Sequence, residues 1–288
     1  MFKFNQQANS ESLYLQVYSR FVKNKVALVC LFILALLVLL VVMAPWFSPY
    51  RYDETNFGLS QVAPNLHNWF GTDSLGRDLF TRTMVGGRTT FLIAFIATLV
   101  SVFLGTIYGS IAGYVGGWLD SLMMRIVDIL YSLPFLFFAI LLVTFFGRNF
   151  ILIFVAIGAV SWLDMSRVVR GQTMSLKHKI FIEAAQISGL SQIKIIAKHI
   201  IPNLIGIVAV YTTLTVPTVI VISAFLSFLG LGVQEPMTSW GLLISDGAAN
   251  LTSWWLVLFP GLFLVLTLLC FNFVGNGLRD ALDPREHR

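Results

Sequence analysis

The chain has 288 residues, of which 57% are hydrophobic and 11% are charged, and its formal net charge is +5. A soluble domain carries about 25% charged and about 45–50% apolar residues, so this composition excludes a water-soluble globule with an ordinary surface. It predicts an all-α integral membrane protein whose exterior mostly faces lipid. The basic residues are scattered between apolar runs, so they indicate membrane topology and not a nucleic-acid-binding surface.

The N-terminal part predicts a surface helix followed by a first membrane span. Residues 1–25 are polar, and their interspersed apolar side chains favour an amphipathic helix at the membrane surface. Val26 to Ala44 is a run of 19 residues without a polar side chain. The apolar core of a signal peptide is shorter, about 7–15 residues, and Pro45 follows directly, so we expect an uncleaved span over 26–46.

Five further apolar runs complete a prediction of six transmembrane helices within a membrane domain of residues 26–278. They lie near residues 91–114, 126–146, 149–167, 203–230 and 254–273. The run between Arg148 and Asp164 has only 15 residues, whereas a span needs about 20. It crosses only if its ends lie in polar protein surroundings or if the helix continues past Asp164 toward Arg170. Pro134 and Pro217 are expected to kink their helices or to be flex points.

The distribution of Lys and Arg is compatible with two topologies. Six spans with a cytoplasmic N-terminus obey the positive-inside rule, but five spans with the N-terminus outside place the same number of basic residues inside. Lys23 and Lys25 adjoin the first span, and the first helix usually sets orientation. We therefore favour six spans, a cytoplasmic N-terminal tail (1–25) and a cytoplasmic C-terminal tail (279–288).

Four glycines, Gly105, Gly109, Gly113 and Gly117, follow one another at intervals of four residues. This spacing places them along one helix face, where a second helix backbone can approach closely. The alternative is a loosely packed, glycine-rich helix end.

Short polar patterns predict local contacts. Thr72 or Asp73 is expected to cap a short helix, Arg77 to pair with Asp78, and Arg125 to pair with Asp128. The two cysteines, Cys30 and Cys270, lie inside apolar runs and are expected to be small apolar fillers.

The polar segment before the fifth span has helical order. Ile182, Ala185 and Gln186 share one face, and Ser188-Gly189 is a plausible helix end. A second helix is expected with an apolar face of four residues: Ile193, Ile196, Ala197 and Ile200. Pro202 fits the first turn of the next helix. The alternative is a solvated loop with some helix.

The sequence lacks the motifs of an ATPase or a hydrolase. There is no Gly-Lys dipeptide and hence no P-loop, no HExxH, no metal-binding spacing among the histidines, and no GxSxG. We expect neither catalysis by this chain nor a cofactor or metal.

Several motifs resemble those of a known family. Glu183-Ala184-Ala185, Gly189 and Pro202 resemble the EAA loop of the membrane subunits of ABC importers, although His199 stands where the generic pattern has an apolar residue. The GTD-x-x-GRD string at residues 71–78 is similar to a signature of the C-type subunit of oligopeptide permeases. Residues 162–172, 225–236 and 277–284 extend the resemblance, which covers the chain from about residue 20 to its end.

The resemblance implies a type I ABC importer permease fold with six transmembrane helices and a cytoplasmic coupling loop at 168–202. In it, Glu183, Ala184, Ala185, Gly189 and Pro202 would couple the chain to ATPase subunits. The implied partners are a homologous B-type permease subunit, two ATP-binding subunits and an extracytoplasmic peptide-binding protein, all at a bacterial inner membrane. Alternatives are the same role for dipeptides or nickel complexes, or, in another class, an ATP-independent channel or scaffold.

Overall fold

The computed structural model describes residues 13–146, 150–250 and 252–282, and the elements in these ranges are all helical. The N-terminal helices are α1 (Leu13–Lys23), α2 (Lys25–Phe47), the 3₁₀ helix η1 (Phe57–Leu59) and α3 (Leu79–Val115). They are followed by α4 (Gly117–Ser132), α5 (Phe135–Phe146), α6 (Phe150–Lys177), α7 (Ile180–Ile187) and α8 (Gln192–Ile195). The π-helical turn η2 (Ile196–Ile200), α9 (Ile201–Phe228), α10 (Trp240–Ala248) and α11 (Trp255–Leu282) complete the chain.

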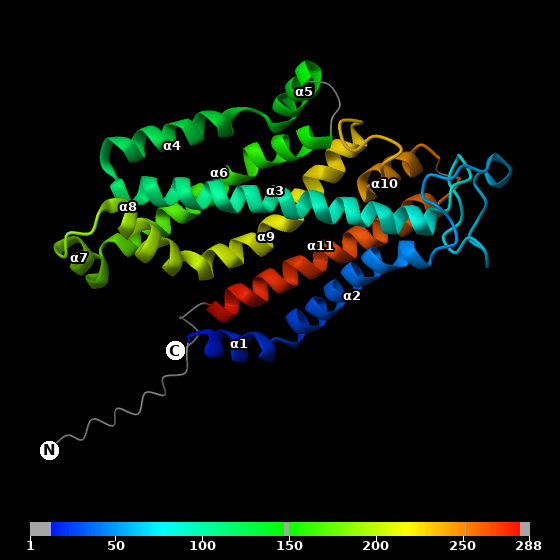
Figure 1. Ribbon diagram of the computed structural model, residues 1–288. Coiled ribbons are helices and arrows are strands. Elements are labelled where there is room, and N and C mark those ends of the chain that lie inside the picture. Colours follow the sequence, from blue (N-terminus) through cyan, green and yellow to red (C-terminus); the bar gives the residue numbers. More distant parts are fainter. Residues whose placement is uncertain (1–12, 147–149, 251, 283–288) are drawn as a thin grey trace.

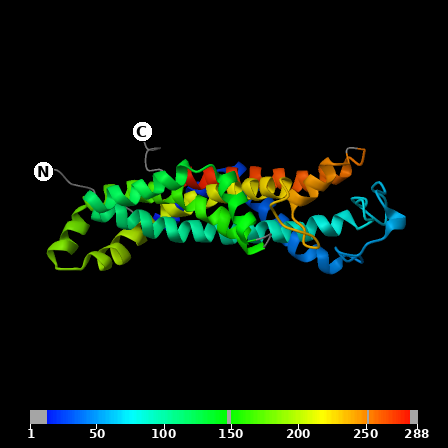
Figure 2. The ribbon, with the colours of Figure 1, turned by 90° about the horizontal axis from the view of Figure 1, so that it is seen from above.

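The long helices run along an elongated molecule. Figure 1 shows α3 in the middle of the bundle, and α3 packs against α2, α6 and α9, while α11 packs against α2 and α9. The short helix α7 lies at one end, and the polar loop between α2 and α3 lies at the other end, in both Figure 1 and Figure 2. The two polar regions that the sequence singled out therefore occupy opposite ends of the bundle.

Among the described residues, α2, α3, α9 with the turns that precede it, and α11 are long and apolar enough to cross a membrane. The pair α4–α5 adds a fifth candidate if it counts as one span, with a bend of 80° at the break that contains Pro134. Helix α6 has 28 residues and continues past Asp164 and Arg170, as the sequence required for a crossing there. The sixth crossing stays a prediction.

Helix α2 shows how the apolar sequence is divided between protein and lipid. Asn24 caps its N-terminus, where Oδ1 accepts a hydrogen bond from the Ala27 amide at 3.1 Å. The buried residues recur every three or four positions: Ala27, Cys30, Leu34, Leu37 and Val41. Cys30 packs in one cluster with Cys270 of α11, both as free thiols. The other faces of α2 expose large apolar side chains, as a helix bordering lipid should.

Helix α3 begins well before the predicted span at 91–114. Asp78 caps it by accepting a hydrogen bond from the Thr81 amide at 2.8 Å, so the predicted cap at Thr72 or Asp73 was wrong. The other carboxylate oxygen of Asp78 accepts a hydrogen bond from Asn68 Nδ2 at 2.9 Å, which fixes the preceding loop to the start of α3. The first turns of α3 bury threonines whose hydroxyls bond to the preceding helical turn, which explains why a polar stretch lies inside a buried helix.

Candidate functional site

The segment between α6 and α9 forms a short helix that is fixed to the bundle by one face. Ile182 and Ala185 of α7, three residues apart, are buried in a cluster with Tyr114 of α3 and Val169 of α6. Gln186 Nε2 donates a hydrogen bond to Tyr114 Oη at 3.1 Å. Helix α7 therefore cannot be displaced without disturbing the ends of α3 and α6.

Gly189 ends α7 with a left-handed turn. Its φ is +74°, a conformation that side chains with a Cβ adopt at a cost. The Leu190 amide donates to the Ala185 carbonyl at 3.2 Å and the Gly189 amide donates to the Gln186 carbonyl at 3.0 Å. These two bonds form a Schellman motif, which satisfies the last carbonyls of the helix. An added Cβ at Gly189 would meet nothing within 4 Å, so only backbone conformation restricts this position.

The outer face of this segment exposes apolar side chains. Ile180 is 84% exposed, Ile187 88% and Ile193 80%. Glu183 and Ala184 are exposed between the first two. Exposed apolar residues rimmed by polar groups are typical of surfaces that contact another protein, a membrane or a ligand. This surface, defined by Ile180, Glu183, Ala184, Ile187 and Ile193, is called the α7 face below.

The structure divides the residues that the sequence grouped together. Ala184 belongs to the α7 face, whereas Ala185 is turned into the chain's own core. Pro202 lies in the first turn of α9, directly after η2. Ile193 of the α7 face lies on α8, and α8, η2 and α9 follow one another without an intervening residue, so this part of the face leads directly to Pro202.

The predicted apolar face of the second short helix was right for Ile196 and Ile200 and wrong for Ile193 and Ala197. The structure exposes Ile193 and Ala197 and buries Ile195, which the sequence pattern had not selected, together with Ile196 and Ile200. The cause is the π-helical turn over Ile196–Ile200, because it has more residues per turn than an α-helix and shifts the buried face.

Three of the four spaced glycines lie where α3 crosses α6. An added Cβ would lie 2.6 Å from Met165 Cβ at Gly105, 2.4 Å from the Ser166 carbonyl oxygen at Gly109, and 2.7 Å from the Arg170 carbonyl oxygen at Gly113. The two backbones are therefore too close for any side chain at these positions. Gly117 is separate, since it begins α4 with φ +60° and faces open space.

Two ion pairs join α4 to α6. Arg170 Nε and Nη2 donate to the Asp120 carboxylate at 2.5 and 2.7 Å. Arg167 Nη2 donates to Asp128 Oδ1 at 2.8 Å, so the predicted partner of Asp128, Arg125, was wrong. The two arginines are three positions apart and the two aspartates eight, so the sequence spacing does not indicate the pairing, which only the packing of α4 against α6 reveals.

At the opposite end of the molecule, four charged side chains join two distant loops. Arg77 donates to Asp73 at 2.6 Å and to Glu235 at 2.7 Å, so the predicted pair with Asp78 was wrong. Arg82, fully buried, lies 3.4 Å from Asp73 and 3.3 Å from Glu235. The hydrogen bond from Arg77 is the main cause that holds the pKa of Glu235 below its usual value. These four residues are called the charge cluster below.

Both loops belong to motifs that carry the family resemblance, but the sequence analysis predicted no contact between them. Asp73 and Arg77 lie in the GTD-x-x-GRD string, and Glu235 lies in the segment 225–236. A charged residue in each motif was the available signal, but 158 residues separate Arg77 from Glu235, so only the fold pairs them.

Together, the membrane-length helices and the anchored helix α7 define a multi-pass membrane protein with an exposed apolar surface at one end. Residues 105–288 match the family model of the binding-protein-dependent transport system inner membrane component. Residues 12–66 match the model of the N-terminal TM domain of oligopeptide transport permease C. The chain belongs to the family of binding-protein-dependent transport system inner membrane components.

Relatives of known name are similar over nearly the whole chain. The oligopeptide transport system permease protein OppC of Haemophilus influenzae is 54% identical over 97% of this chain and 91% of the relative. OppC of Escherichia coli K12 is 55% identical over 97% of this chain and 94% of the relative. The dipeptide transport system permease protein DppC of Bacillus subtilis is 41% identical over 100% of this chain and 93% of the relative.

A solved structure shares the fold. A chain of the MetNI methionine ABC transporter, in an inward-facing conformation, aligns with a TM-score of 0.59 at 18% identity. The alignment covers 70% of this chain and 96% of that chain. The fold is that of a type I ABC importer permease, as the sequence predicted.

Proposed function

We propose that this chain is the membrane-spanning subunit of an ATP-driven oligopeptide importer, and that it forms half of the translocation pathway. Relatives named for oligopeptide transport are 44–55% identical, whereas two relatives named for dipeptide transport are 41% and 39% identical, which favours oligopeptides over dipeptides. The permease carries the pathway, and ATP hydrolysis belongs to separate subunits, since the sequence has no P-loop.

The observation that carries the mechanism is that α7 is anchored to the bundle by one face and exposed on the other. Its inner face is held by Ile182, Ala185 and the Gln186–Tyr114 hydrogen bond, while its outer face is free to dock. An ATPase subunit that closes on the α7 face would move α7 as a body, and the motion would pass to α3 through Tyr114, to α6 through Val169 and to α9 through Pro202. Glu183 can pair with a basic group of the ATPase.

This role requires α7 and both chain termini to be cytoplasmic. The partners are then a homologous B-type permease subunit, two ATP-binding subunits below the membrane and an extracytoplasmic peptide-binding protein above it. The loop that contains the charge cluster would face the binding protein. Specificity would reside mainly in that partner, because a pathway for many side chains can hold none of them tightly.

Uptake of labelled tetrapeptide, dipeptide and nickel, in cells with and without the gene, tests the cargo. We expect only tetrapeptide uptake to require the gene; loss of another cargo alone would contradict the oligopeptide assignment. Uptake that persists after ATP depletion would favour the channel alternative.

Two variants of Gly189 test whether α7 transmits the motion of the ATPase to the membrane helices. Valine disfavours the left-handed turn, so Gly189→Val should insert in the membrane but uncouple ATP hydrolysis from uptake. Asparagine tolerates that turn, so Gly189→Asn should keep both. Normal uptake by the valine variant would contradict this role of α7.

A further inference from the structure

A groove lies where the end of α2 meets the polar loop and the start of α3. Its volume is about 420 Å³. Leu40 and Ala44 of α2, Phe80 of α3 and Trp69 of the loop form apolar walls, and Trp69 stacks edge-to-face on Phe80 with ring centroids 5.0 Å apart. None of these residues belongs to the α7 face or to the charge cluster, so the proposed function assigns no ligand to the groove itself.

The groove is continuous with the surface of α2 that borders lipid. Leu36, Leu39 and Phe47 are exposed on the same stretch of a helix that is apolar enough to span the membrane. Leu40 and Ala44 lie within that span, about two turns and about one turn before its end, respectively. The apolar part of the groove therefore opens at the depth of the acyl chains, where a water-soluble partner cannot reach it.

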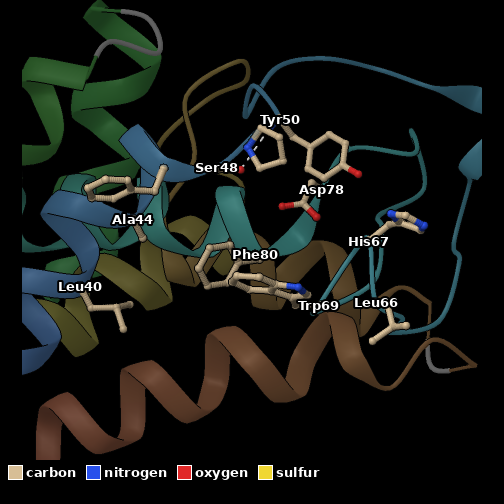
Figure 3. Close-up of a pocket in the computed structure, with 11 residues that line it drawn as sticks. Leu40, Ala44, Ser48, Tyr50, Leu66, His67, Trp69, Asp78 and Phe80 are labelled. Carbon is tan, nitrogen blue, oxygen red and sulfur yellow. Dashed lines mark hydrogen bonds between the residues drawn. The ribbon is translucent and has the colours of Figure 1, made fainter.

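The other end of the groove offers unused hydrogen-bond donors. Within the described part of the chain, Tyr50 Oη, the His67 ring and Trp69 Nε1 form no hydrogen bond. Figure 3 shows Tyr50, His67 and Trp69 on the side of the groove away from Leu40 and Ala44, with Trp69 beside Phe80. Tyrosine and tryptophan favour the boundary between the apolar core of a membrane and its headgroups, where one end of the ring is dry and the other is wet.

The acidic group at the groove does not oppose an anion strongly, because it is already satisfied. Asp78 accepts hydrogen bonds from Asn68 Nδ2 at 2.9 Å, from the Thr81 amide at 2.8 Å and from Thr81 Oγ1 at 2.7 Å. Its side chain is buried and it caps α3, whose N-terminus favours a negative charge at this position. The donors that remain free suit the ester and phosphate oxygens of a glycerolipid.

We propose that this groove is a binding site for one membrane phospholipid. An acyl chain lies against Leu40, Ala44 and Phe80, and the glycerol ester and phosphate oxygens accept hydrogen bonds from Tyr50, His67 and Trp69. The gradient from apolar wall to polar rim runs in the same direction as the gradient from acyl chain to headgroup. Bound lipid would fix the polar loop against α2.

The test is photolabelling of the full-length chain, purified with its accompanying subunits and placed in nanodiscs that contain a phosphatidylethanolamine with a diazirine on its acyl chain. Labelled residues are mapped by mass spectrometry. Ala44→Trp fills the groove, and Ala35→Trp is the matched control because Ala35 is exposed on the same helix outside the groove. We expect labelling at residues 40–50 and 66–69 to fall at least about tenfold in Ala44→Trp and to stay unchanged in Ala35→Trp, since the lost apolar contact exceeds two methylenes.

A second variant guards against misfolding of the first. His67→Ala changes an exposed ring of the rim, and it should weaken retention of phospholipid through delipidation, as counted by native mass spectrometry, without altering assembly. Equal labelling of the groove in Ala44→Trp and Ala35→Trp would overturn the proposal. So would cross-linking of a photoreactive residue at position 69 to a partner protein in place of lipid. Neither result bears on peptide uptake, so the proposed function is tested separately.

Discussion

Arg170 of α6 and Asp120 of α4 form a two-pronged ion pair, in which both carboxylate oxygens accept a hydrogen bond from one guanidinium. The Asp120 side chain is 11% exposed and that of Arg170 is 33% exposed. Asp120 and Val127 are the buried residues of α4, so this pair, and not an apolar face, holds the start of α4 to α6. Because α6 leads into α7 after two residues, α4 is tied to the element that would dock the ATPase.

Asp120→Asn should loosen this tie. The asparagine leaves a guanidinium partly buried without its counter-charge, and hydrogen bonds to charged groups contribute about 1.5–3 kcal/mol. Asp128→Asn is the matched control on the same helix. The Asp128 side chain is 63% exposed and that of its partner Arg167 is 40% exposed, so we expect a loss of unfolding free energy within about 1 kcal/mol. Thermal unfolding in detergent compares the two, and equal losses would contradict the special role of Asp120.

The close packing of α3 against α6 at Gly105, Gly109 and Gly113 allows a second comparison of two variants. Gly109→Ala would place a Cβ 2.4 Å from the Ser166 carbonyl oxygen, a backbone atom that cannot move aside alone. Such overpacking costs about 1–3 kcal/mol, so the variant should unfold at a lower temperature. Gly171→Ala on α6 is the control, because nothing lies within 4 Å of its added Cβ. It should be neutral or slightly stabilising, since alanine favours a helix over glycine by roughly 0.5–1 kcal/mol.

The sequence predicted the all-helical membrane fold and most helix positions, because long apolar runs leave few alternatives in lipid. It also identified Gly189 as the end of α7, because a helix that ends at a glycine is determined by neighbouring residues in the sequence. It failed where partners come from elsewhere in the chain. Arg77 was assigned to its neighbour Asp78, although Asp78 is occupied as a helix cap and Arg77 reaches Glu235. The burial of Ile195 was missed for a different reason. A π-helical turn interrupts the periodicity of about 3.6 residues from which buried helix faces are inferred.

The charge cluster should make stability depend on pH in a defined direction. The pKa of Glu235 is lowered in the folded state, so Glu235 stabilises the fold above the unfolded pKa, and this contribution is lost as pH falls through the folded pKa. Glu235→Gln should therefore unfold at a lower temperature than the wild type at pH 7, and the difference should shrink below about pH 4.5, the ordinary value for glutamate. The exposed Glu54→Gln should show no such difference at either pH.

Asp246 should show the opposite sign. Partial burial is the main cause that raises its pKa in the folded state, although the residue keeps an exposed surface, so its ionisation opposes folding only weakly as pH rises from the unfolded pKa through the folded one. Asp246→Asn should be more stable than the wild type at pH 7 and equal to it below about pH 3.8, the ordinary value for aspartate. A variant that is destabilised at neutral pH would mean that Asp246 has a binding partner in the folded protein.

The α7 face can be tested without disturbing the fold. Ile187 is 88% exposed, so Ile187→Glu removes no internal contact and should leave insertion and unfolding temperature unchanged. If an ATPase cleft receives this side chain, a buried and unpaired carboxylate would weaken docking and abolish ATP-driven uptake. Phe57→Glu, at the opposite end of the molecule and 72% exposed, controls for the added charge and should not affect association with the ATPase. Co-purification of the ATPase subunits measures docking directly. If Ile187→Glu retains them as well as Phe57→Glu does, the outer surface of α7 is not where the ATPase binds, and Gly189 must act on transport through the internal packing of α7 alone.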